Sequence, residues 1–267
     1  MGPAKIMGIV NVTPDSFSDG GEFLDPQRAI AHGRELAAEG ADVLDVGGES
    51  TRPGAAGVTA EEELARVGRV VDALAGDEGP PVSIDTSKLA VAEAALEAGA
   101  AMVNDVTALR SESELAGLCA EHRCEVVLMH MLGDPRTMQE NPVYDDVVDD
   151  IKAFLAERID FAVSQGIEEE RIWIDPGIGF GKNVEHNLEL HRRLGEFSDL
   201  GRPIVFGSSR KSFIGRLTGA QVDQRLGGTI ASNVIAYANG AAMLRVHEVA
   251  PMREALTVAD AILQPDP

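Results

Sequence analysis

Short apolar segments alternate along the chain with amphipathic segments rich in Ala, Leu and Glu, and this alternation restricts the possible folds more than any other feature. The apolar segments are expected to form eight strands, at 6–12, 42–47, 82–85, 101–106, 126–131, 171–175, 203–207 and 242–246. The amphipathic segments are expected to form helices, at 26–39, 60–75, 88–98, 112–121, 144–165, 184–195, 224–239 and 251–263. Strands that are apolar throughout are typical of parallel sheets covered by helices on both faces.

Eight strand–helix units within 267 residues match the size and the number of units of a TIM (β/α)8 barrel. A doubly wound open sheet is the alternative α/β architecture for the same alternation. No linker, low-complexity tract or run of charges separates one part of the chain from another. Residues 1–267 are therefore expected to form a single domain.

The charge of the chain excludes several classes of partner. Lys and Arg number 23 against 44 Asp and Glu, which gives a formal net charge of −21. Such a chain repels nucleic acid and anionic membrane. No apolar run reaches the roughly 18 to 20 residues of a membrane span, and the N-terminus lacks a signal-peptide pattern. We expect a soluble cytoplasmic protein that acts on small molecules, with cations gathered in the pocket if a substrate is anionic.

The cysteines and histidines indicate no metal site of their own. Cys119 and Cys124 fit neither a zinc ribbon nor a disulfide framework and are expected to be small buried or helix-end residues. The histidines include no H-E-x-x-H pair. Four of them fall in helix-like stretches and are expected at the surface or at helix caps: His32, His122, His186 and His191.

Polar side chains stand at the carboxyl end of every predicted strand. Barrel active sites are built at that rim, from strand ends and the loops that follow. One such residue could be a cap or a turn former, whereas eight in succession favour a polar ligand at one mouth. In chain order they are Asn11, Glu49, Asp85, Asn104 with Asp105, His130, Asp175, Ser209 with Arg210 and Lys211, and Arg245 with His247.

Two loops after predicted strands are longer than a connection requires. Residues 13–24 read TPDSFSDGGEFL and residues 50–59 read STRPGAAGVT. Both loops could be plain surface loops. Because both lie at the expected active rim and are rich in Gly, Pro, Ser and Asp, we interpret them as lids over the barrel mouth.

The glycine-rich segment 177–182, GIGFGK, suggests a nucleotide-binding loop at first sight. A Walker A loop requires Gly where Pro176 stands and Ser or Thr where Asn183 stands, so that interpretation fails. What remains is a flexible turn after Asp175 that would let a flat ligand approach the backbone, with Phe180 as a possible wall.

Eight segments in the same order resemble dihydropteroate synthases: GIVNVTPDSFSDGG (8–21), LDVGGESTRPGA (44–55), SIDTSK (83–88), VNDV (103–106), MHM (129–131), DPGIGFGK (175–182), SSRKSFIG (208–215) and RVH (245–247). The first two are highly specific, whereas the looser barrel pattern is shared with pterin-binding methyltransferases. The resemblance implies a TIM barrel, usually dimeric, that joins a pterin-methyl diphosphate to para-aminobenzoate and releases diphosphate. It also implies competition by sulfonamides at the aminobenzoate site.

The resemblance implies a pterin site made of Asp85, Asn104, Asp175 and Lys211. The chemistry agrees, because carboxylates accept from the pterin amino group and ring N–H, while an amide or ammonium serves the acceptors. From the residues alone, the two aspartates could equally hold Lys211 or Arg245 in buried ion pairs. Met129 would flank the ring, or be plain core.

The resemblance also implies an anion site at Arg245 and His247, and second-loop contacts from Thr51 and Arg52. Asn11 would contact Mg²⁺, or be a simple turn residue. Ser212 would offer helix-start N–H groups to the aminobenzoate carboxylate, or be an ordinary cap.

The implied chemistry begins with loss of diphosphate, and the aminobenzoate nitrogen then attacks the methylene cation. The catalytic residues would be Arg52, Lys211, Arg245 and His247, which take up charge, and no catalytic triad is needed. A Schiff-base role for Lys211 is the rival interpretation. The alternative functions are a methyltetrahydrofolate-dependent methyltransferase and a non-catalytic pterin-binding paralogue.

Overall fold

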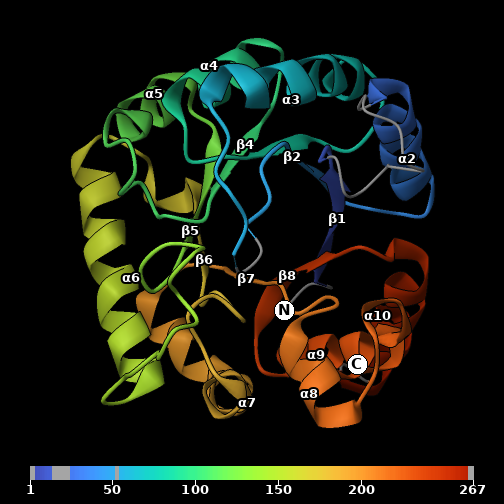
Figure 1. The fold of residues 1–267 in the computed structure, drawn as a ribbon, viewed down its shortest axis with the longest axis vertical. Helices are drawn as coiled ribbons and strands as arrows, with labels where there is room; N and C mark the ends of the chain where they lie inside the picture. Colours follow the sequence, from blue (N-terminus) through green and yellow to red (C-terminus); the bar gives the residue numbers. More distant parts are fainter. Residues whose placement is uncertain (1–3, 14–24, 52–53, 264–267) are drawn as a thin grey trace.

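The chain forms a closed barrel of parallel strands (Figure 1). The computed structural model describes residues 4–13, 25–51 and 54–263. The strands follow one another around the barrel in chain order: β1 (Lys5–Asn11), β2 (Val43–Gly47), β3 (Val82–Asp85), β4 (Met102–Asp105), β5 (Glu125–Met129), β6 (Ile172–Asp175), β7 (Ile204–Phe206) and β8 (Ala241–Val246). Because β8 pairs with β1, the predicted TIM barrel is confirmed and the open sheet is excluded. Each predicted strand is present, with ends within two residues of those expected.

Helices surround the barrel on its outside (Figure 1). They are α2 (Pro26–Ala38), α3 (Ala60–Ala75), α4 (Leu89–Glu97), α5 (Glu114–His122), α6 (Val147–Ser164), α7 (Val184–Arg192), α8 (Ser212–Thr218), α9 (Leu226–Ala238) and α10 (Val249–Leu263), with short 3₁₀ helices η1 (Glu169–Arg171), η2 (Leu194–Leu200) and η3 (Val222–Gln224). Helix α8 was not among the predicted helices, because seven residues are too few to show a helical apolar period. No helix in these described ranges combines the length and the apolar character needed to cross a bilayer.

The barrel interior has an apolar layer below and a polar layer above. The apolar layer is a single cluster of Met7, Val43, Met102, Val127, Trp173, Val205 and Met243. Side chains alternate along a strand, so the residue two positions further on also points inward. On four strands that residue is charged or an amide and belongs to the polar layer: Asp45, Asn104, Asp175 and Arg245.

Asp85 joins the same layer, because it pairs in register with Asn104 on the neighbouring strand. The two-residue period of the strands therefore places charged and amide side chains directly above an apolar floor. An apolar floor keeps water away from the lower side of the layer, which strengthens the interactions among these charges.

Two predictions about histidines had different outcomes. His186 takes part in the capping of α7, because Asn183 at the N-cap accepts from its backbone N–H at 2.8 Å. His191 is not at the surface, and that prediction was wrong. It is buried, and its ring nitrogens lie 2.6 Å from the carbonyl oxygen of Asn187 and 2.6 Å from Oγ of Ser232. His191 lies on α7, and the apolar period of this nine-residue helix is too short to show that α9 packs over the face that carries His191. The two cysteines are buried, as predicted.

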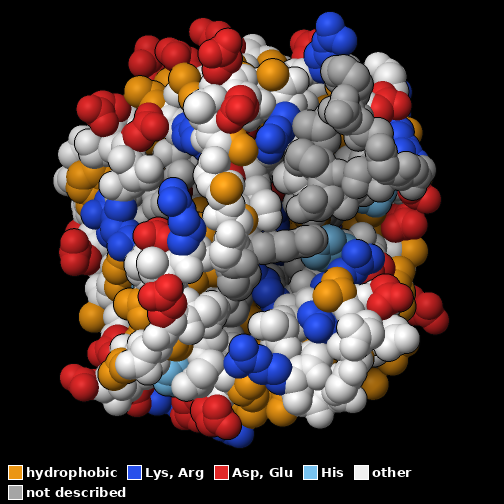
Figure 2. Space-filling model, in the orientation of Figure 1, with side chains coloured by type: hydrophobic (Ala, Val, Ile, Leu, Met, Phe, Trp, Pro, Cys, Tyr) orange, Lys and Arg blue, Asp and Glu red, His pale blue; other side chains and the backbone are white. Residues whose placement is uncertain are grey.

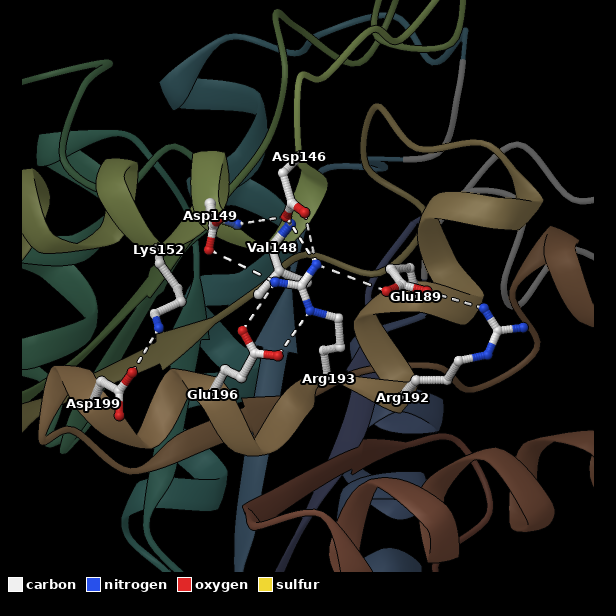
Figure 3. Close-up of polar contacts among 9 residues, drawn as sticks. All are labelled: Asp146, Val148, Asp149, Lys152, Glu189, Arg192, Arg193, Glu196 and Asp199. Carbon is white, nitrogen blue, oxygen red and sulfur yellow. Dashed lines mark hydrogen bonds and ion pairs between the residues drawn. The ribbon is translucent and has the colours of Figure 1, made fainter.

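One arginine ties two neighbouring elements on the outside of the barrel (Figure 3). Arg193 follows α7, and its Nη1 atom lies 2.7 Å from Oδ2 of Asp146, the N-cap of α6. Its Nε and Nη2 atoms donate to both carboxylate oxygens of Glu196 in η2, at 2.8 and 3.0 Å. The carboxylate of Asp146 also caps α6, so this network fixes the start of α6 against the end of α7.

Candidate active site

The carboxyl ends of the strands open on the face of the barrel that Figure 2 shows. Lys and Arg side chains, in blue, lie around the centre of this face, whereas Asp and Glu side chains, in red, lie mostly toward its margin. A chain with a net charge of −21 therefore has cations around its mouth. This distribution fits an anionic ligand, which the remaining surface would repel.

At the centre of the polar layer, Arg245 bridges two aspartates. Its Nε atom donates to Oδ2 of Asp45 at 2.6 Å, and its Nη2 atom donates to Oδ2 of Asp85 at 2.8 Å. Oδ2 of Asp45 also accepts from Nδ2 of Asn104 at 3.0 Å. The exposed fraction of the side chain rises from 0% for Asp45 to 12% for Asp85 and 21% for Arg245. Asp45 therefore lies at the bottom of the site, and the other residues lie closer to the mouth.

The two carboxylates share one guanidinium, and this changes the acidity of the more accessible one. Burial raises the pKa of Asp85 to about 7, and the nearby carboxylates of Asp45, Glu63 and Asp105 add to the effect, while Arg245 opposes it. A carboxyl group that titrates near neutral pH in a buried site is typical of a functional residue.

Asp175 faces the same space from the other side of the barrel. Its Oδ1 atom accepts from the backbone N–H of Gly177 at 2.7 Å, and burial raises its pKa. A Cβ atom at Gly207 would lie 3.7 Å from Cβ of Arg245 and 4.0 Å from Oδ2 of Asp175. Since both side chains flank one glycine, they belong to one site, and the missing side chain at this position leaves room between them.

The turn after β6 depends on its glycines. Gly177, Gly179 and Gly181 have φ angles of 71°, 82° and 67°, which L side chains rarely adopt. A Cβ atom at Gly177 would lie 1.9 Å from the carbonyl oxygen of His130. The segment is therefore a tight turn packed on the loop after β5. A turn after Asp175 was expected, and its flexibility stays a prediction.

Lys211 and Phe180 meet at the edge of this turn. Nζ of Lys211 lies 3.9 Å from the centre of the Phe180 ring, as in a cation–π contact, and Phe180 is buried. Lys211 occupies the N-cap position of α8 without a side-chain cap bond, and Ser212 is the first helical residue. The interpretation of Ser212 as an ordinary cap was therefore wrong. Its role toward the aminobenzoate carboxylate stays a prediction.

A buried lysine that the sequence analysis did not assign supports the turn from below. Nζ of Lys182 lies 2.9 Å from Nδ1 of His130 and donates to the carbonyl oxygen of Phe180 at 2.9 Å. Burial lowers the pKa of both groups, and that of His130 falls to about 2. His130 is therefore neutral and serves as an acceptor for Lys182, so it holds the turn and does not face a ligand.

Several other predicted rim residues also hold loops in place. Asp105 accepts from the backbone N–H groups of Thr107 and Leu109 at 2.8 and 2.6 Å. Arg210 donates to Glu248, with Nε at 2.7 Å from Oε1. These contacts shape the loops after β4 and β7, which agrees with the simpler turn-forming interpretation for these residues.

The second loop is fixed at its base by the half-buried Lys88. Nζ of Lys88 lies 2.6 Å from Oε2 of Glu49 and 2.5 Å from Oε2 of Glu63. Oε1 of Glu49 accepts from the backbone N–H of Val58, so both ends of the loop are held. Thr51 lies half-buried in this loop. Arg52 lies outside the described residues, as does 14–24, which is most of the first proposed lid.

The remaining predicted residues also lie at the carboxyl end of the barrel. His247 follows β8, and its Nδ1 atom lies 2.9 Å from Oγ of Ser209. Met129 packs in an apolar cluster with Val106, Met131, Met138 and Phe180 at the mouth. Asn11 is the half-buried last residue of β1. No group of three His, Cys, Asp or Glu side chains in the described ranges is arranged to hold a metal.

Asp45 is the site residue that sequence reasoning missed. The sequence analysis considered strand ends, whereas Asp45 is the central residue of the five-residue strand β2, VLDVG. A charged residue inside an otherwise apolar strand was the available signal, because a carboxylate is buried only where it has a partner.

Comparison with known proteins finds relatives that match nearly the whole chain. The family described as pterin binding enzyme matches residues 7–247. The dihydropteroate synthase of Escherichia coli is 46% identical over 258 residues, which are 97% of this chain and 91% of that protein. A solved structure of Xanthomonas albilineans dihydropteroate synthase with 4-aminobenzoic acid is 49% identical, with a TM-score of 0.93 and coverage of 100% and 95%. A Yersinia pestis dihydropteroate synthase with a sulfonamide drug complex is 43% identical, with a TM-score of 0.93 and coverage of 97% and 94%.

The clash at Gly177 leads to a prediction about stability. Gly177→Ala should lower the free energy of unfolding by more than about 2 kcal/mol, because the added Cβ atom clashes with the backbone and also carries the cost of a positive φ. Gly219→Ala is the matched control, since Gly219 has a φ of 76° and nothing within 4 Å of its Cβ position. The control should cost about 1–2 kcal/mol, as expected for the φ angle alone. Equal losses in urea unfolding of the two variants would contradict the described turn.

Proposed function

The chain belongs to the pterin-binding enzyme family, and we propose that it condenses (7,8-dihydropterin-6-yl)methyl diphosphate with 4-aminobenzoate to give 7,8-dihydropteroate and diphosphate. It is a transferase of the dihydropteroate synthase kind, and its reaction would be a step of folate biosynthesis. Sulfonamides would compete for its aminobenzoate site, as the drug complex of the Yersinia pestis enzyme suggests. The observation that carries the proposal is the polar layer, in which Asp85, Asn104, Asp175 and Arg245 share one pocket above an apolar floor.

The pterin ring would bind in the space bounded by Asp85, Asn104 and Asp175. Carboxylates accept hydrogen bonds from the amino group and ring N–H groups of the pterin, and Asn104 can both donate and accept. Lys211 would donate to the ring acceptors. Phe180 and Met129 line the mouth beside them and provide apolar surface for the flat ring.

The diphosphate would lie on the outer side of Arg245, near His247 and the second loop with Thr51 and Arg52. Two of the five N–H hydrogens of Arg245 are bonded to Asp45 and Asp85, and the other three have no partner in the described part of the chain. Arg245 therefore has two functions: it holds the carboxylates of the pterin site, and it still has donors for the leaving group. The initial ion-pair and anion-site interpretations are both compatible with this geometry.

Charge uptake, and not nucleophilic catalysis, would drive the reaction. The bond between the methylene carbon and the diphosphate oxygen breaks first, and its electron pair leaves with the diphosphate beside Arg245 and His247. The neutral arylamine nitrogen then attacks the methylene cation, which the pterin ring stabilises, and releases its proton. Lys211 lies over the Phe180 ring as an ammonium group would, which favours a donor role over a Schiff base.

A magnesium ion would bind at Asn11. No cage of carboxylates or histidines is present in the described ranges, so the chain alone offers a single amide oxygen at the end of β1. This fits Mg²⁺, which commonly takes one or two protein ligands and completes its shell with substrate phosphate and water. When bound, the ion would supply neutralisation of diphosphate charge.

We place the enzyme in the cytoplasm as a homodimer. Both cysteines are free, as is usual in a reducing compartment. Exposed apolar side chains lie on two adjacent helices, with Leu226 and Ile235 on α9 and Val258, Ile262 and Leu263 on α10 (Figure 1). Packing against a second copy of the chain would bury exposed apolar side chains of these two helices. Sedimentation equilibrium should give twice the chain mass of 28.3 kDa, and a monomer at micromolar concentration would contradict this arrangement.

One assay separates this function from its alternatives. The protein should convert pterin-methyl diphosphate and 4-aminobenzoate into dihydropteroate and diphosphate in a one-to-one ratio, and a chelator should abolish the reaction. A methyltetrahydrofolate-dependent methyltransferase has no use for diphosphate contacts at Arg245 and His247 and would release no diphosphate. A non-catalytic paralogue would bind the pterin without turnover. Either result would contradict the proposal.

The raised pKa of Asp85 predicts a pH dependence of pterin binding. Only the ionised carboxyl group accepts two N–H groups, so affinity for 6-hydroxymethyl-7,8-dihydropterin should rise about tenfold per pH unit below pH 7 and then level off. In the free protein, stability changes with pH in the opposite direction to pterin affinity. The folded state binds this proton more tightly than the unfolded state, so the contribution of Asp85 to stability falls as pH rises from about 4 to about 7.

Calorimetry between pH 5.5 and 8.5 measures this dependence. Asp85→Asn should weaken pterin binding at pH 8 and remove the pH dependence of affinity that comes from Asp85. The remaining pH dependence would come from Asp175, because burial also raises the pKa of Asp175. An unchanged pH profile in the variant would show that Asp85 does not accept from the pterin.

A further inference from the structure

We propose that Asp45 is a positioning residue that sets the orientations of both Arg245 and Asn104 for the pterin diphosphate. This inference rests on the proposed function, because it assigns how two parts of that site are held together. Asp45 is completely buried at the bottom of the polar layer. A ligand in the pocket would meet Asn104 and Arg245 and would act on Asp45 only through them.

Asp45 reaches two strands on opposite sides of its own. It lies on β2, whose neighbours in the barrel are β1 and β3. Its Oδ2 atom accepts from Arg245 on β8, beyond β1, and from Asn104 on β4, beyond β3. One oxygen atom therefore links a residue of the pterin site to a residue of the diphosphate site.

The contact with Asp45 determines which way the Asn104 amide points. A carboxylate can only accept, so the Asn104 nitrogen must face Asp45 and the Asn104 carbonyl oxygen must face away from it. Asn104 then presents a carbonyl acceptor and its second N–H to a ligand. Without Asp45, both orientations of the amide would be available, and the pterin would have to select one of them.

The contact with Arg245 determines the plane of the guanidinium group. Asp45 holds Nε at 2.6 Å while Asp85 holds Nη2 at 2.8 Å, and two contacts on a planar group fix its orientation. The two N–H groups of Nη1, which have no partner in the described ranges, are thereby aimed at a fixed position. If only Asp85 remained, the guanidinium could rotate about that single contact.

Asp45 also destabilises the fold at this position. Its Oδ1 atom is buried and makes no hydrogen bond to any described residue. A buried carboxylate oxygen without a partner destabilises a fold, whereas an apolar residue would extend the floor of the barrel. Its two contacts with site residues give the physical reason for its presence.

The test measures two ligands separately, each by calorimetry with the full chain. The probes are 6-hydroxymethyl-7,8-dihydropterin and inorganic pyrophosphate with Mg²⁺. Asp45→Asn should weaken binding of each probe about five- to tenfold, as expected for loss of one charge-assisted contact. Simple removal of a negative charge would instead strengthen pyrophosphate binding, so the two explanations predict opposite signs.

Double-mutant cycles show whether Asp45 acts through its two contacts. Asp45→Asn should no longer weaken pyrophosphate binding in the Arg245→Ala background, nor pterin binding in the Asn104→Ala background. Losses that persist in those backgrounds would overturn the proposal. Ser83→Ala is the matched control, because Ser83 is the register partner of Asp45 and is equally buried. It should change both affinities less than twofold.

The outcomes of this proposal and of the proposed function are distinguishable. If the unaltered chain binds neither probe, the proposed function fails. If it binds both and Asp45→Asn leaves the affinities unchanged, the positioning role fails. If Asp45→Asn does not fold, Asp45→Ser, which keeps a small hydrogen-bond acceptor, takes its place in the same measurements. Failure of both variants to fold would also contradict the proposal, because Asp45 would then be needed for the fold and not for the site.

Discussion

The site depends on a half-buried guanidinium group held between two carboxylates. Arg245 contacts Asp45 and Asp85 above an apolar floor, where charges are costly unless they are paired. Burial raises the pKa of Asp85 to about 7, and the neighbouring carboxylate of Asp45 adds to this rise while Arg245 opposes it. This arrangement suits a ligand that brings N–H donors to the carboxylates and an anion to the guanidinium.

The barrel provides this arrangement through its strand period. On β2, β4, β6 and β8, an apolar residue of the floor is followed two positions later by a charged or amide residue of the layer above. The loops then fix the upper edge: Lys182 with His130 supports the turn after β6, and Lys88 with Glu49 holds the base of the second loop. Several charged residues at the rim thus hold the loops in place.

Sequence reasoning predicted the barrel and most of its site, because apolar period and strand ends are visible in a single chain. It placed Asp85, Asn104, Asp175 and Arg245 at one mouth, as observed. It missed Asp45, because it considered strand ends and Asp45 lies in the middle of β2. It also missed the burial of His191, because the packing partner of that helix face is far away in sequence. The first lid, 14–24, lies outside the described residues.

The most direct test of this account is a crystal structure of the protein with 6-hydroxymethyl-7,8-dihydropterin and pyrophosphate. The account predicts the ring within hydrogen-bonding distance of Asp85, Asn104 and Asp175. It also predicts pyrophosphate on the side of Arg245 that faces away from Asp45, with the contact between Arg245 and Asp45 retained. A ring bound outside the polar layer, or an Arg245 that leaves both carboxylates to reach the anion, would contradict it.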